Sequence, residues 1–450
     1  NYYKKPFCLK GLFFIFVADK TYFMTLDTLH SLFLSCTGVA TDTRKIEDGS
    51  LFVALKGDHF DANTFAKEAL TKGAKYVVID NPDYYIDDRT LLVENTLITL
   101  QELAKFHRNY LGLPIIALTG SNGKTTTKEL IHAVLAKKYN TLATIGNLNN
   151  HIGVPLTLLR FTKETEIGIV EMGANHQKEI AFLCAIAQPD YGYITNFGKA
   201  HLEGFGGVEG VIKGKSEMYD YLSGHKKTIF VNQDDDLQDQ KTRSAQRYTF
   251  STTDKNCAVY IENVVANPMV CVNYNGLSIH SHLIGIYNAH NINAAITIGH
   301  FFKVVDADIK TALENYIPEN NRSQLMQKNG NEIILDAYNA NPSSMQAAIA
   351  NFIQLQPTPK IAVLGDMFEL GTESPSEHAK IVAQLENKTE ITVYFVGKDF
   401  YAQRITKPHL HFFETYAAFA EALQTKLPKN SLLLIKGSRG MALEKTLDLF

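Results

Sequence analysis

The chain has 450 residues, of which 45% are hydrophobic and 20% charged, and its formal net charge is -3. This length suggests about three domains, and the composition is ordinary for a soluble globular protein. The charge gives no reason to expect nucleic acid or an anionic membrane surface as a partner, and no apolar run approaches the ~20 residues that span a bilayer.

The five cysteines lie far apart in the sequence and form no CxxC pair. A zinc site or a redox motif is therefore not expected. A sparse, odd set of cysteines suits a reducing compartment, so we expect a cytoplasmic protein without stable membrane insertion.

The first 23 residues differ in character from the rest of the chain. An apolar stretch from Leu12 to Ala18 superficially resembles a signal peptide, but Lys10 precedes it closely and no A-x-A site comes after it. Met24 opens a plausible domain start. We interpret residues 1–23 as a non-native or disordered extension, with a secretory signal as the alternative.

The first block, residues 24–112, alternates short apolar segments with a helical one, a pattern typical of an α/β domain. The expected strands cover residues 51–55, 76–80 and 91–94, and the expected helix covers residues 62–74.

The second block, residues 113–316, has the pattern of a doubly wound, mostly parallel sheet with its loops at the carboxyl ends of the strands. Strands are expected at 114–120, 167–173 and 191–196, and a helix at 125–139. Residues 226–282 are richer in β-type residues and predict an extension at the edge of this sheet.

The third block, residues 317–450, predicts a compact Rossmann-like domain. The expected strands are 332–338, 360–367, 391–397 and 431–437, and the expected helices are 345–355, 376–387 and 417–427. A GxGxxG fingerprint does not occur there, so a dinucleotide is not the expected ligand.

The strongest local motif is T-G-S-N-G-K-T-T at residues 119–126, placed between an expected strand and an expected helix. Gly120 and Gly123 let backbone N–H groups turn towards a phosphate, and the helix N-terminus favours anions. Lys124 can reach the terminal phosphates, and the Thr125 hydroxyl can ligate Mg²⁺. The spacing is two residues tighter than usual, and a simple glycine turn is the alternative. The loop alone does not distinguish ligases from kinases, motors or switches.

Two downstream side chains are candidates for metal chemistry, and two lysines come after them in the sequence. Glu171 ends an expected strand, where P-loop proteins often hold Mg²⁺, although a solvated acid is the alternative. His201 lies in a glycine-rich loop and could ligate a metal, or be structural. Lys213 and Lys215 could equally lie on a solvated helix face. A GxSxG nucleophile motif is absent from the sequence.

Together these elements resemble the Mur ligase family from Met24 to Phe450. The resemblance is specific because five stretches occur in the family's order: GNLNNHIGVPLTLL (146–159), HLEGFGGVEGVIKGKSE (201–217), DAYNANPSSMQAA (336–348), GDMFELG (365–371) and KGSRGMALE (436–444). It implies ATP-dependent ligation of D-alanyl-D-alanine to UDP-N-acetylmuramoyl-tripeptide through an acyl phosphate, in peptidoglycan precursor synthesis. Sister ligases that add a single amino acid, related folate or polyamino-acid ligases, and a nucleotide-binding protein without turnover are the alternatives.

The resemblance also implies an α/β fold of three domains, in agreement with the three blocks. These are an N-terminal α/β UDP-binding domain, a central P-loop domain with a doubly wound, mostly parallel sheet, and a C-terminal Rossmann-like domain that closes over ATP. The implied cofactors are ATP and two Mg²⁺ ions, with a CO₂-derived carbamate on Lys215; Lys213 is the second choice. We expect a monomer.

The family pattern assigns roles to individual residues. The segment GIYNAHNINAA (285–295) matches it except at Tyr287, where relatives carry His. The implied catalytic set is Lys124, Glu171, His201, Lys215 and Arg322. The implied ATP site comprises Gly120, Ser121, Asn122, Gly123, Lys124, Thr125, Thr126, Asn288, Asn291, Arg322 and Asp336. The implied metal ligands are Thr125, Glu171, His201 and carbamylated Lys215. The implied substrate site comprises Thr43, Arg44, Asn147, Asn150, His151, Tyr338, Asn339, Asn341, Ser438 and Arg439. For Ser438 the alternative is a helix N-cap, and for Arg439 it is an ordinary surface arginine.

Overall fold

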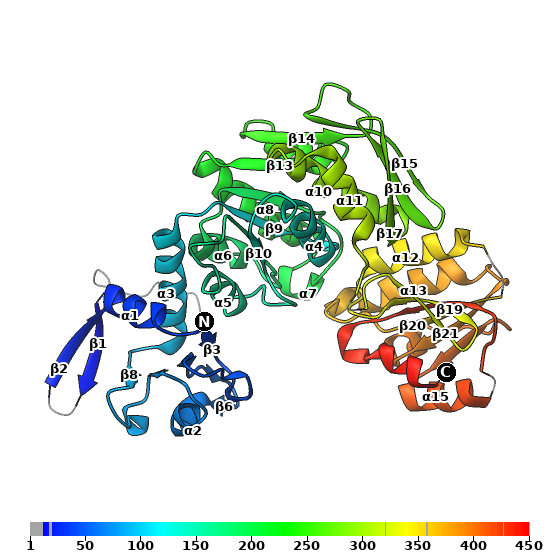
Figure 1. The fold of residues 1–450 in the computed structure, drawn as a ribbon. Helices are drawn as coiled ribbons and strands as arrows, with labels where there is room; N and C mark the ends of the chain where they lie inside the picture. Colours follow the sequence, from blue (N-terminus) through cyan, green and yellow to red (C-terminus); the bar gives the residue numbers. More distant parts are fainter. Residues whose placement is uncertain (1–11, 18–19, 320, 357–358, 426, 450) are drawn as a thin grey trace. The chain divides into compact units, whose positions relative to one another are not determined.

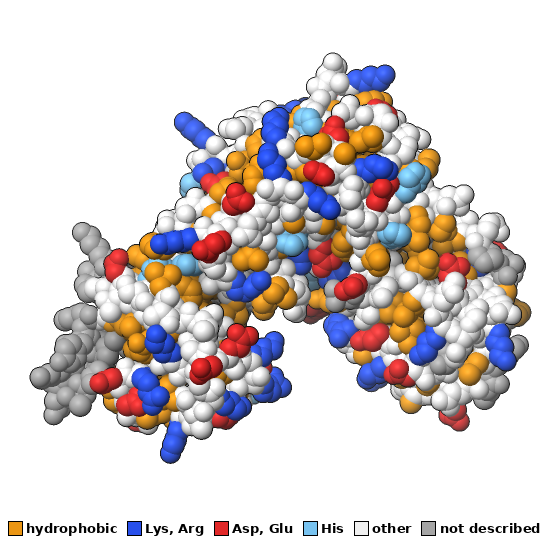
Figure 2. All heavy atoms as spheres, viewed as in Figure 1, with side chains coloured by type: hydrophobic (Ala, Val, Ile, Leu, Met, Phe, Trp, Pro, Cys, Tyr) orange, Lys and Arg blue, Asp and Glu red, His pale blue; other side chains and the backbone are white. Residues whose placement is uncertain are grey.

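The computed structural model describes residues 12–17, 20–319, 321–356, 359–425 and 427–449 (Figure 1). Two compact units divide the chain, and each is described by itself. The first unit comprises Asn1–Ala117, Asn140–Met172 and Ala181–Asp190, and the second comprises Leu118–Tyr139, Gly173–Ile180 and Tyr191–Phe450. On the face drawn in Figure 2, acidic and basic side chains are interspersed, in keeping with a net charge close to zero.

The N-terminal part of the first unit is a four-stranded parallel sheet in the order β3–β4–β7–β8. Its strands are β3 (Val39–Ala40), β4 (Leu51–Val53), β7 (Tyr76–Ile79) and β8 (Thr90–Leu92). The three expected strands are confirmed, and a short hairpin of β5 (Lys56–Gly57) and β6 (Phe60–Asp61) lies between them in the sequence. Apolar side chains from the sheet and from α2 (Ala66–Thr71) form one buried core.

Helices α1 (Leu26–Leu34) and α3 (Thr96–Leu111) of this unit were not predicted. The side chain of Asn95 accepts a hydrogen bond from the Ile98 N–H at the start of α3, and Gly112 adopts a left-handed φ of 64° at its end. Both are standard helix-terminating devices. Later segments of the chain add β10 (Thr141–Ala143), α5 (Gly153–Leu158), β11 (Ile167–Glu171) and α6 (Glu179–Ala187), the last of which begins in the second unit.

The largest sheet has nine strands in the order β10–β11–β9–β12–β13–β14–β15–β16–β17. Those not yet named are β9 (Ile115–Thr119), β12 (Tyr191–Ile194), β13 (Thr228–Asn232), β14 (Arg247–Ser251), β15 (Val259–Ala266), β16 (Met269–Tyr274) and β17 (Leu277–Ile284). Strands β12 to β15 pair in parallel, whereas β15, β16 and β17 pair antiparallel. The predicted edge extension over residues 226–282 is therefore confirmed.

Six helices accompany the strands of this block in the second unit. They are α4 (Lys124–Leu135), α7 (Leu202–Phe205), α8 (Val208–Gly224), α9 (Asp236–Thr242), α10 (Ala289–Phe301) and α11 (Asp306–Asn315). Of these only α4 was predicted, and it starts one residue earlier than expected. Helix α10 is buried along most of its length because nearly every side chain from Asn291 to Ile298 is apolar or small.

The C-terminal block contains a six-stranded sheet in the order β18–β19–β23–β20–β21–β22, in which only β18 runs antiparallel to its neighbour. The strands are β18 (Gln324–Lys328), β19 (Asn331–Asp336), β20 (Lys360–Gly365), β21 (Ile391–Val396), β22 (Leu410–Phe413) and β23 (Leu432–Lys436). Its helices are α12 (Pro342–Gln354), α13 (Ser374–Leu385), α14 (Lys398–Ala402) and α15 (Tyr416–Thr425). The four predicted strands and three predicted helices are all confirmed, as is the three-domain α/β fold; the exact domain boundaries remain predictions.

The expected extension is described only in part. Strands β1 (Leu12–Val17) and β2 (Lys20–Thr25) pair antiparallel, and Met24 lies inside β2. Residues 1–11 and 18–19, also part of that prediction, lie outside the described residues. Within the described part of the chain, none of the helices is both long and apolar enough to cross a membrane.

Candidate active site

The predicted phosphate loop joins β9 to α4 in the second unit. Buried β9 ends at Thr119, and α4 begins at Lys124. Gly120 and Gly123 have φ values of 144° and 79°. A Cβ atom at Gly120 would lie 1.9 Å from Thr195 Oγ1, so steric and backbone reasons both require glycine there.

Two residues beyond β12 hold this loop in place. Thr195 Oγ1 donates to the Asn122 carbonyl at 2.6 Å, and Asn196 Nδ2 donates to the same oxygen at 3.0 Å. Asn196 Oδ1 accepts from the Asn122 N–H at 3.2 Å, and Ser121 Oγ donates to the Gly198 carbonyl at 2.6 Å. Sequence reasoning gave Thr195 and Asn196 no role, although they end a predicted strand next to the loop.

The loop has the features of an anion site. The first N–H groups of a helix have no partner within it, and the helix dipole favours negative charge there. Lys124 Nζ donates to the Gly120 carbonyl at 2.8 Å, which places its positive charge beside the loop. The Thr125 and Thr126 side chains are nearly buried at the same helix end. The arrangement can bind phosphate groups.

The predicted Asn288, just before α10, and Asn291, within it, are both buried, and Asn291 fastens this helix to α4. Asn291 Oδ1 accepts from Thr127 Oγ1 at 3.0 Å, and its Nδ2 donates to Asn288 Oδ1 at 2.8 Å. A Cβ at Gly123 would lie 2.5 Å from Asn291 Oδ1. Asn291 therefore lies directly against the phosphate loop, whereas the Asn288 amide donates to the Ile284 carbonyl.

Tyr287, where the sequence departs from the family pattern, is partly buried. Its hydroxyl lies 3.1 Å from Ser323 Oγ, and burial with the nearby Asp336 charge raises its pKa well above the usual range. A Cβ at Gly285 would lie 2.4 Å from the tyrosine ring. The tyrosine thus fills space and contacts the C-terminal segment.

Lys215 is fully buried in α8. Its Nζ has no hydrogen-bond partner among the described residues and lies 5.2 Å from the centroid of the Phe205 ring. Burial, and secondarily the charge of Lys124, lower the pKa of Lys215 to about 7. Lys213 is exposed on the same helix. Of the two candidates, Lys215 has the perturbed environment that is typical of a functional amine.

His201 lies at the start of α7 in a left-handed conformation with φ of 53°. Its Nδ1 is hydrogen-bonded to Glu369 Oε2, and this bond lowers the pKa of Glu369. Glu369 lies in the GDMFELG stretch, which carried the family resemblance, but had no predicted role. The sequence feature that could have indicated a role for Glu369 is its position as the one glutamate of this stretch, two residues before Gly371.

The predicted nucleotide residues of the C-terminal block lie close together. The Arg322 guanidinium stacks 3.6 Å from the centroid of the Tyr338 ring. Asp336 accepts a hydrogen bond from the Ser323 N–H at 3.1 Å and pairs with Lys436 Nζ at 2.6 Å. Lys436 is almost fully buried. Sequence reasoning missed Lys436, although it begins the KGSRGMALE stretch.

Asn341 connects this block with the phosphate loop. Its Nδ2 donates to Asn122 Oδ1 at 2.7 Å, while its Oδ1 accepts from the Ser344 N–H and so caps α12. Asn339 is exposed, and its Oδ1 accepts from the Arg439 N–H at 3.3 Å.

Ser438 and Arg439 have structural partners. Ser438 Oγ accepts from the Phe368 N–H at 2.9 Å and donates to the Ala340 carbonyl at 3.3 Å. Arg439 pairs with Glu444 at 2.7 Å. Ser438 thus ties neighbouring loops together rather than capping a helix through its side chain.

In the first unit, Glu171 is 1% exposed at the end of β11. Its Oε1 accepts from Asn149 Nδ2 at 2.8 Å, and its Oε2 has no hydrogen-bond partner among the described residues. A buried carboxylate oxygen without a partner is costly and would be satisfied by a cation. Asn149 was not predicted, although it lies between two predicted residues.

The remaining predicted residues of the first unit are mostly exposed. Asn147, Asn150 and His151 are exposed, and Asn150 Oδ1 accepts from backbone N–H groups at the start of α5. Thr43 and Arg44 lie in a short 3₁₀ turn after β3, where Arg44 forms a bidentate pair with Asp42 and lowers the carboxyl pKa of Asp42.

Three or more His, Cys, Asp or Glu side chains do not gather into a metal cage anywhere in the described part of the chain. Mg²⁺ is usually held by one or two carboxylates, substrate phosphates and water rather than by such a cage. The partnerless carboxylate oxygen of Glu171 has chemistry that suits a site of that kind.

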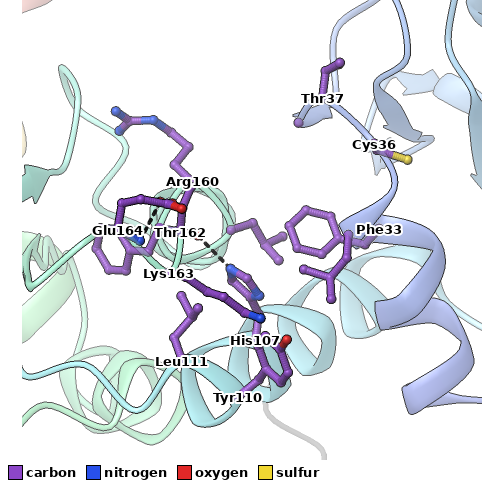
Figure 3. Close-up of a pocket in the computed structure, with 14 residues that line it drawn as sticks. Phe33, Cys36, Thr37, His107, Tyr110, Leu111, Arg160, Thr162, Lys163 and Glu164 are labelled. Carbon is purple, nitrogen blue, oxygen red and sulfur yellow. Dashed lines mark hydrogen bonds between the residues drawn. The ribbon is translucent and has the colours of Figure 1, made fainter.

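A cavity of about 530 Å³ lies in the first unit, away from the predicted site residues (Figure 3). Its lining comes from the end of α1, the end of α3 and residues 159–164. His107 lines it and hydrogen-bonds the Phe161 carbonyl at 2.8 Å. None of the residues predicted for nucleotide, metal or substrate lines this cavity.

Known protein families match three successive parts of this chain. The Mur ligase middle domain matches residues 118–299, the Mur ligase glutamate ligase domain matches residues 321–439, and the Mur ligase family catalytic domain matches residues 35–108. The UDP-N-acetylmuramoyl-tripeptide–D-alanyl-D-alanine ligase of Bacillus subtilis (strain 168) is 36% identical over 91% of this chain and 92% of its own length. That of Escherichia coli (strain K12) is 34% identical over 92% and 93%.

Solved structures agree with the sequence matches. MurF from Acinetobacter baumannii superposes with a TM-score of 0.82 at 32% identity, covering 94% of this chain and 98% of its own. MurF ligase from Thermotoga maritima in complex with ADP gives a TM-score of 0.80 at 28% identity, covering 93% and 97%. Three consecutive family matches and relatives aligned over almost their whole length lead to one conclusion: this chain belongs to the Mur ligase family.

Proposed function

We propose that this protein uses ATP to join D-alanyl-D-alanine to UDP-N-acetylmuramoyl-tripeptide, forming ADP and phosphate, in peptidoglycan precursor synthesis. The observation that carries the proposal is the alignment of more than 90% of both chains with ligases of that name. The phosphate loop supports the use of ATP, because its buried strand, two left-handed glycines and helix N-terminus form an anion site.

The nucleotide would bind with its phosphates on residues 120–126 and its terminal phosphate near Lys124. Arg322, stacked on Tyr338, supplies a guanidinium suited to a phosphate. Asp336 would accept a hydrogen bond from the ribose, and Asn288 and Asn291 would form the wall of the site behind the loop.

Glu171, His201 and Thr125 would hold Mg²⁺, with the carbamate of Lys215 as a further acidic group and two ions in all. Bound Mg²⁺ would neutralise phosphate charge. Lys215 is suited to carbamylation because only a neutral amine attacks CO₂, and a pKa of about 7 leaves roughly half of the amines neutral at pH 7. An N–C bond forms, a proton is released, and the amine becomes an anion.

The reaction would proceed in two displacements. The tripeptide carboxylate attacks the γ-phosphorus, the bond to ADP breaks, and an acyl phosphate forms. The dipeptide amine then attacks the acyl carbon, phosphate leaves, and the amine loses a proton. Lys124 and Arg322 stabilise charge, and catalysis consists mainly of positioning.

The substrate residues are assigned on the same basis. Thr43 and Arg44 would bind the uridine diphosphate. Asn147, Asn150 and His151 would face the sugar and peptide, and Tyr338, Asn339, Asn341, Ser438 and Arg439 the incoming dipeptide. The exposure of Arg44 and Asn339 supports access to a ligand, whereas the buried Ser438 could act only through the loops it joins. We further propose a cytoplasmic monomer.

The decisive assay measures phosphate release with ATP and Mg²⁺, offering the UDP-tripeptide with and without D-alanyl-D-alanine. We expect release only with both substrates, and a product heavier by the dipeptide. Lys124→Ala should abolish turnover without changing thermal stability. Release with single amino acids would identify a sister ligase, and nucleotide binding without release would identify a binding protein.

A further inference from the structure

Glu369 occupies an unusual position for a surface carboxylate. It lies in the turn between β20 and α13, and its side chain is half exposed, yet its Oε2 is bonded to His201 Nδ1. The two residues come from segments matched by different Mur ligase domain families. Of all the predicted metal ligands, His201 alone has an acidic side chain bonded to it among the described residues.

The contact is part of a close association between two turns. The Glu203 N–H donates to the Glu369 carbonyl at 3.2 Å. A Cβ atom at Gly371 would lie 3.2 Å from the Glu203 side chain. His201 and Glu369 both have positive φ values, 53° and 62°, a conformation that residues other than glycine rarely adopt. Strained residues that meet in this way often mark functional positions.

The chemistry of the pair determines which ring nitrogen can bind a cation. An ionised carboxylate only accepts hydrogen bonds, so Nδ1 of His201 carries the hydrogen. In the neutral ring, Nε2 then has the lone pair. A carboxylate on the second nitrogen fixes the tautomer and orientation of a metal-binding histidine and makes it more basic.

We propose that Glu369 is a positioning residue that presents His201 Nε2 to the divalent cation, so that the metal site is completed only when the C-terminal segment is in place. The inference rests on the proposed function, because it takes His201 to be a metal ligand. It goes further because the C-terminal block would then contribute to metal affinity, through the hydrogen bond from His201 to the Glu369 carboxylate.

Mn²⁺ with ADP is the probe, applied to the full-length protein, because electron spin echo modulation detects a directly bound imidazole nitrogen. The wild type should show this nitrogen signal, and His201→Ala should lose it. Glu369→Ala should weaken or abolish the signal and raise the Kd for Mn²⁺ about 10-fold or more. Glu369→Gln should retain part of it, because an amide oxygen can still accept from Nδ1–H.

Glu203→Gln is the matched control. It removes one negative charge from an exposed residue of the facing turn and should leave both signal and Kd unchanged. An undiminished signal and Kd in Glu369→Ala would overturn the proposal. Equal weakening by Glu203→Gln would also overturn it, because general charge would then explain the effect.

A wild type without the nitrogen signal would show that His201 is not a ligand and would likewise overturn the proposal. The ligase assignment is tested separately, by whether phosphate release requires both substrates. Thermal melting of each variant checks folding, and the half-exposed position of Glu369 makes a folding defect unexpected.

Discussion

Lys215 shows at the residue scale how an environment changes the chemistry of a side chain. A lysine at an exposed position keeps its charge, but in α8 the amine is buried, without a hydrogen-bond partner among the described residues and within range of the charge of Lys124. Each of these factors disfavours the ammonium form. Burying this amine therefore lowers the stability of the fold. A residue that lowers stability in this way is usually retained because it has a function.

Replacing Lys215 should separate stability from activity. We expect Lys215→Met to leave the free energy of unfolding unchanged or to raise it by about 1–3 kcal/mol, because an unsatisfied buried amine is removed. Ligation should fall at least 100-fold. Denaturant unfolding and phosphate release measure the two effects.

Lys213→Met provides the comparison on the same helix. Lys213 is exposed, so both quantities should stay close to the wild type. Loss of activity in Lys213→Met but not in Lys215→Met would show that the second-choice lysine is the functional one.

At the scale of elements, a chain of hydrogen bonds joins α1, α3 and the segment after α5 in the first unit. His107 Nε2 lies 2.8 Å from the Phe161 carbonyl, and His107 Nδ1 lies 2.9 Å from His30 Nε2. The carbonyl only accepts, so Nε2 of His107 donates and Nδ1 accepts from His30. Both rings are buried, and His107 must be neutral for this pattern because its Nδ1 accepts a hydrogen bond. Burial is the main reason why the pKa of His30 falls to about 4 and that of His107 falls below its usual value.

The stability of this unit should consequently depend on pH. In the unfolded chain a histidine titrates near pH 6.5, so between about pH 6.5 and 4 the unfolded state binds more protons than the folded state. Stability is therefore full above pH 6.5 and falls as pH is lowered, by at most about 1.4 kcal/mol per pH unit for each histidine. Asp27 is the acidic neighbour of His30 and opposes the shift.

His30→Gln isolates this contribution, because a glutamine amide can still donate to His107 Nδ1 but does not titrate. We expect a shallower loss of stability between pH 6.5 and 4.5 than in the wild type, measured by urea unfolding. Parallel pH profiles for the two proteins would contradict the assignment.

At the scale of the whole molecule, side chains far apart in the sequence join the middle and C-terminal family segments. In the second unit, Lys199 Nζ donates to Glu377 Oε1 at 2.8 Å, and the Lys199 N–H donates to Ser343 Oγ at 2.8 Å. Glu377 is 1% exposed and also pairs with Lys380 of its own helix. A buried carboxylate shared by two lysines depends on both partners.

A double-mutant cycle measures this connection. Lys199→Met and Glu377→Gln should each lower the free energy of unfolding, with a coupling of about 1 kcal/mol, since Lys199 is partly exposed and solvent weakens the pair. The more exposed Lys380→Met should couple to Glu377→Gln less strongly. Additive effects of Lys199→Met and Glu377→Gln would show that the connection contributes no stability.

The sequence by itself determined the alternation of strands and helices, the phosphate loop and the family, because each depends on residues adjacent in the chain. Strands such as β9 and β20 are continuous apolar runs, and the loop motif spans eight residues. Several helices were missed, α1 and α3 among them, since their apolar faces become evident only when they are packed.

Only the tertiary structure decided which predicted residues have partners and which are buried. Thr127 meets Asn291 across 164 positions, Asp336 meets Lys436 across 100, and His201 meets Glu369 across 168. No local pattern encodes such pairings, because they arise when strands distant in sequence are placed side by side. The same is true of Lys215: the sequence does not distinguish it from a surface lysine, and the fold buries its amine and lowers its pKa.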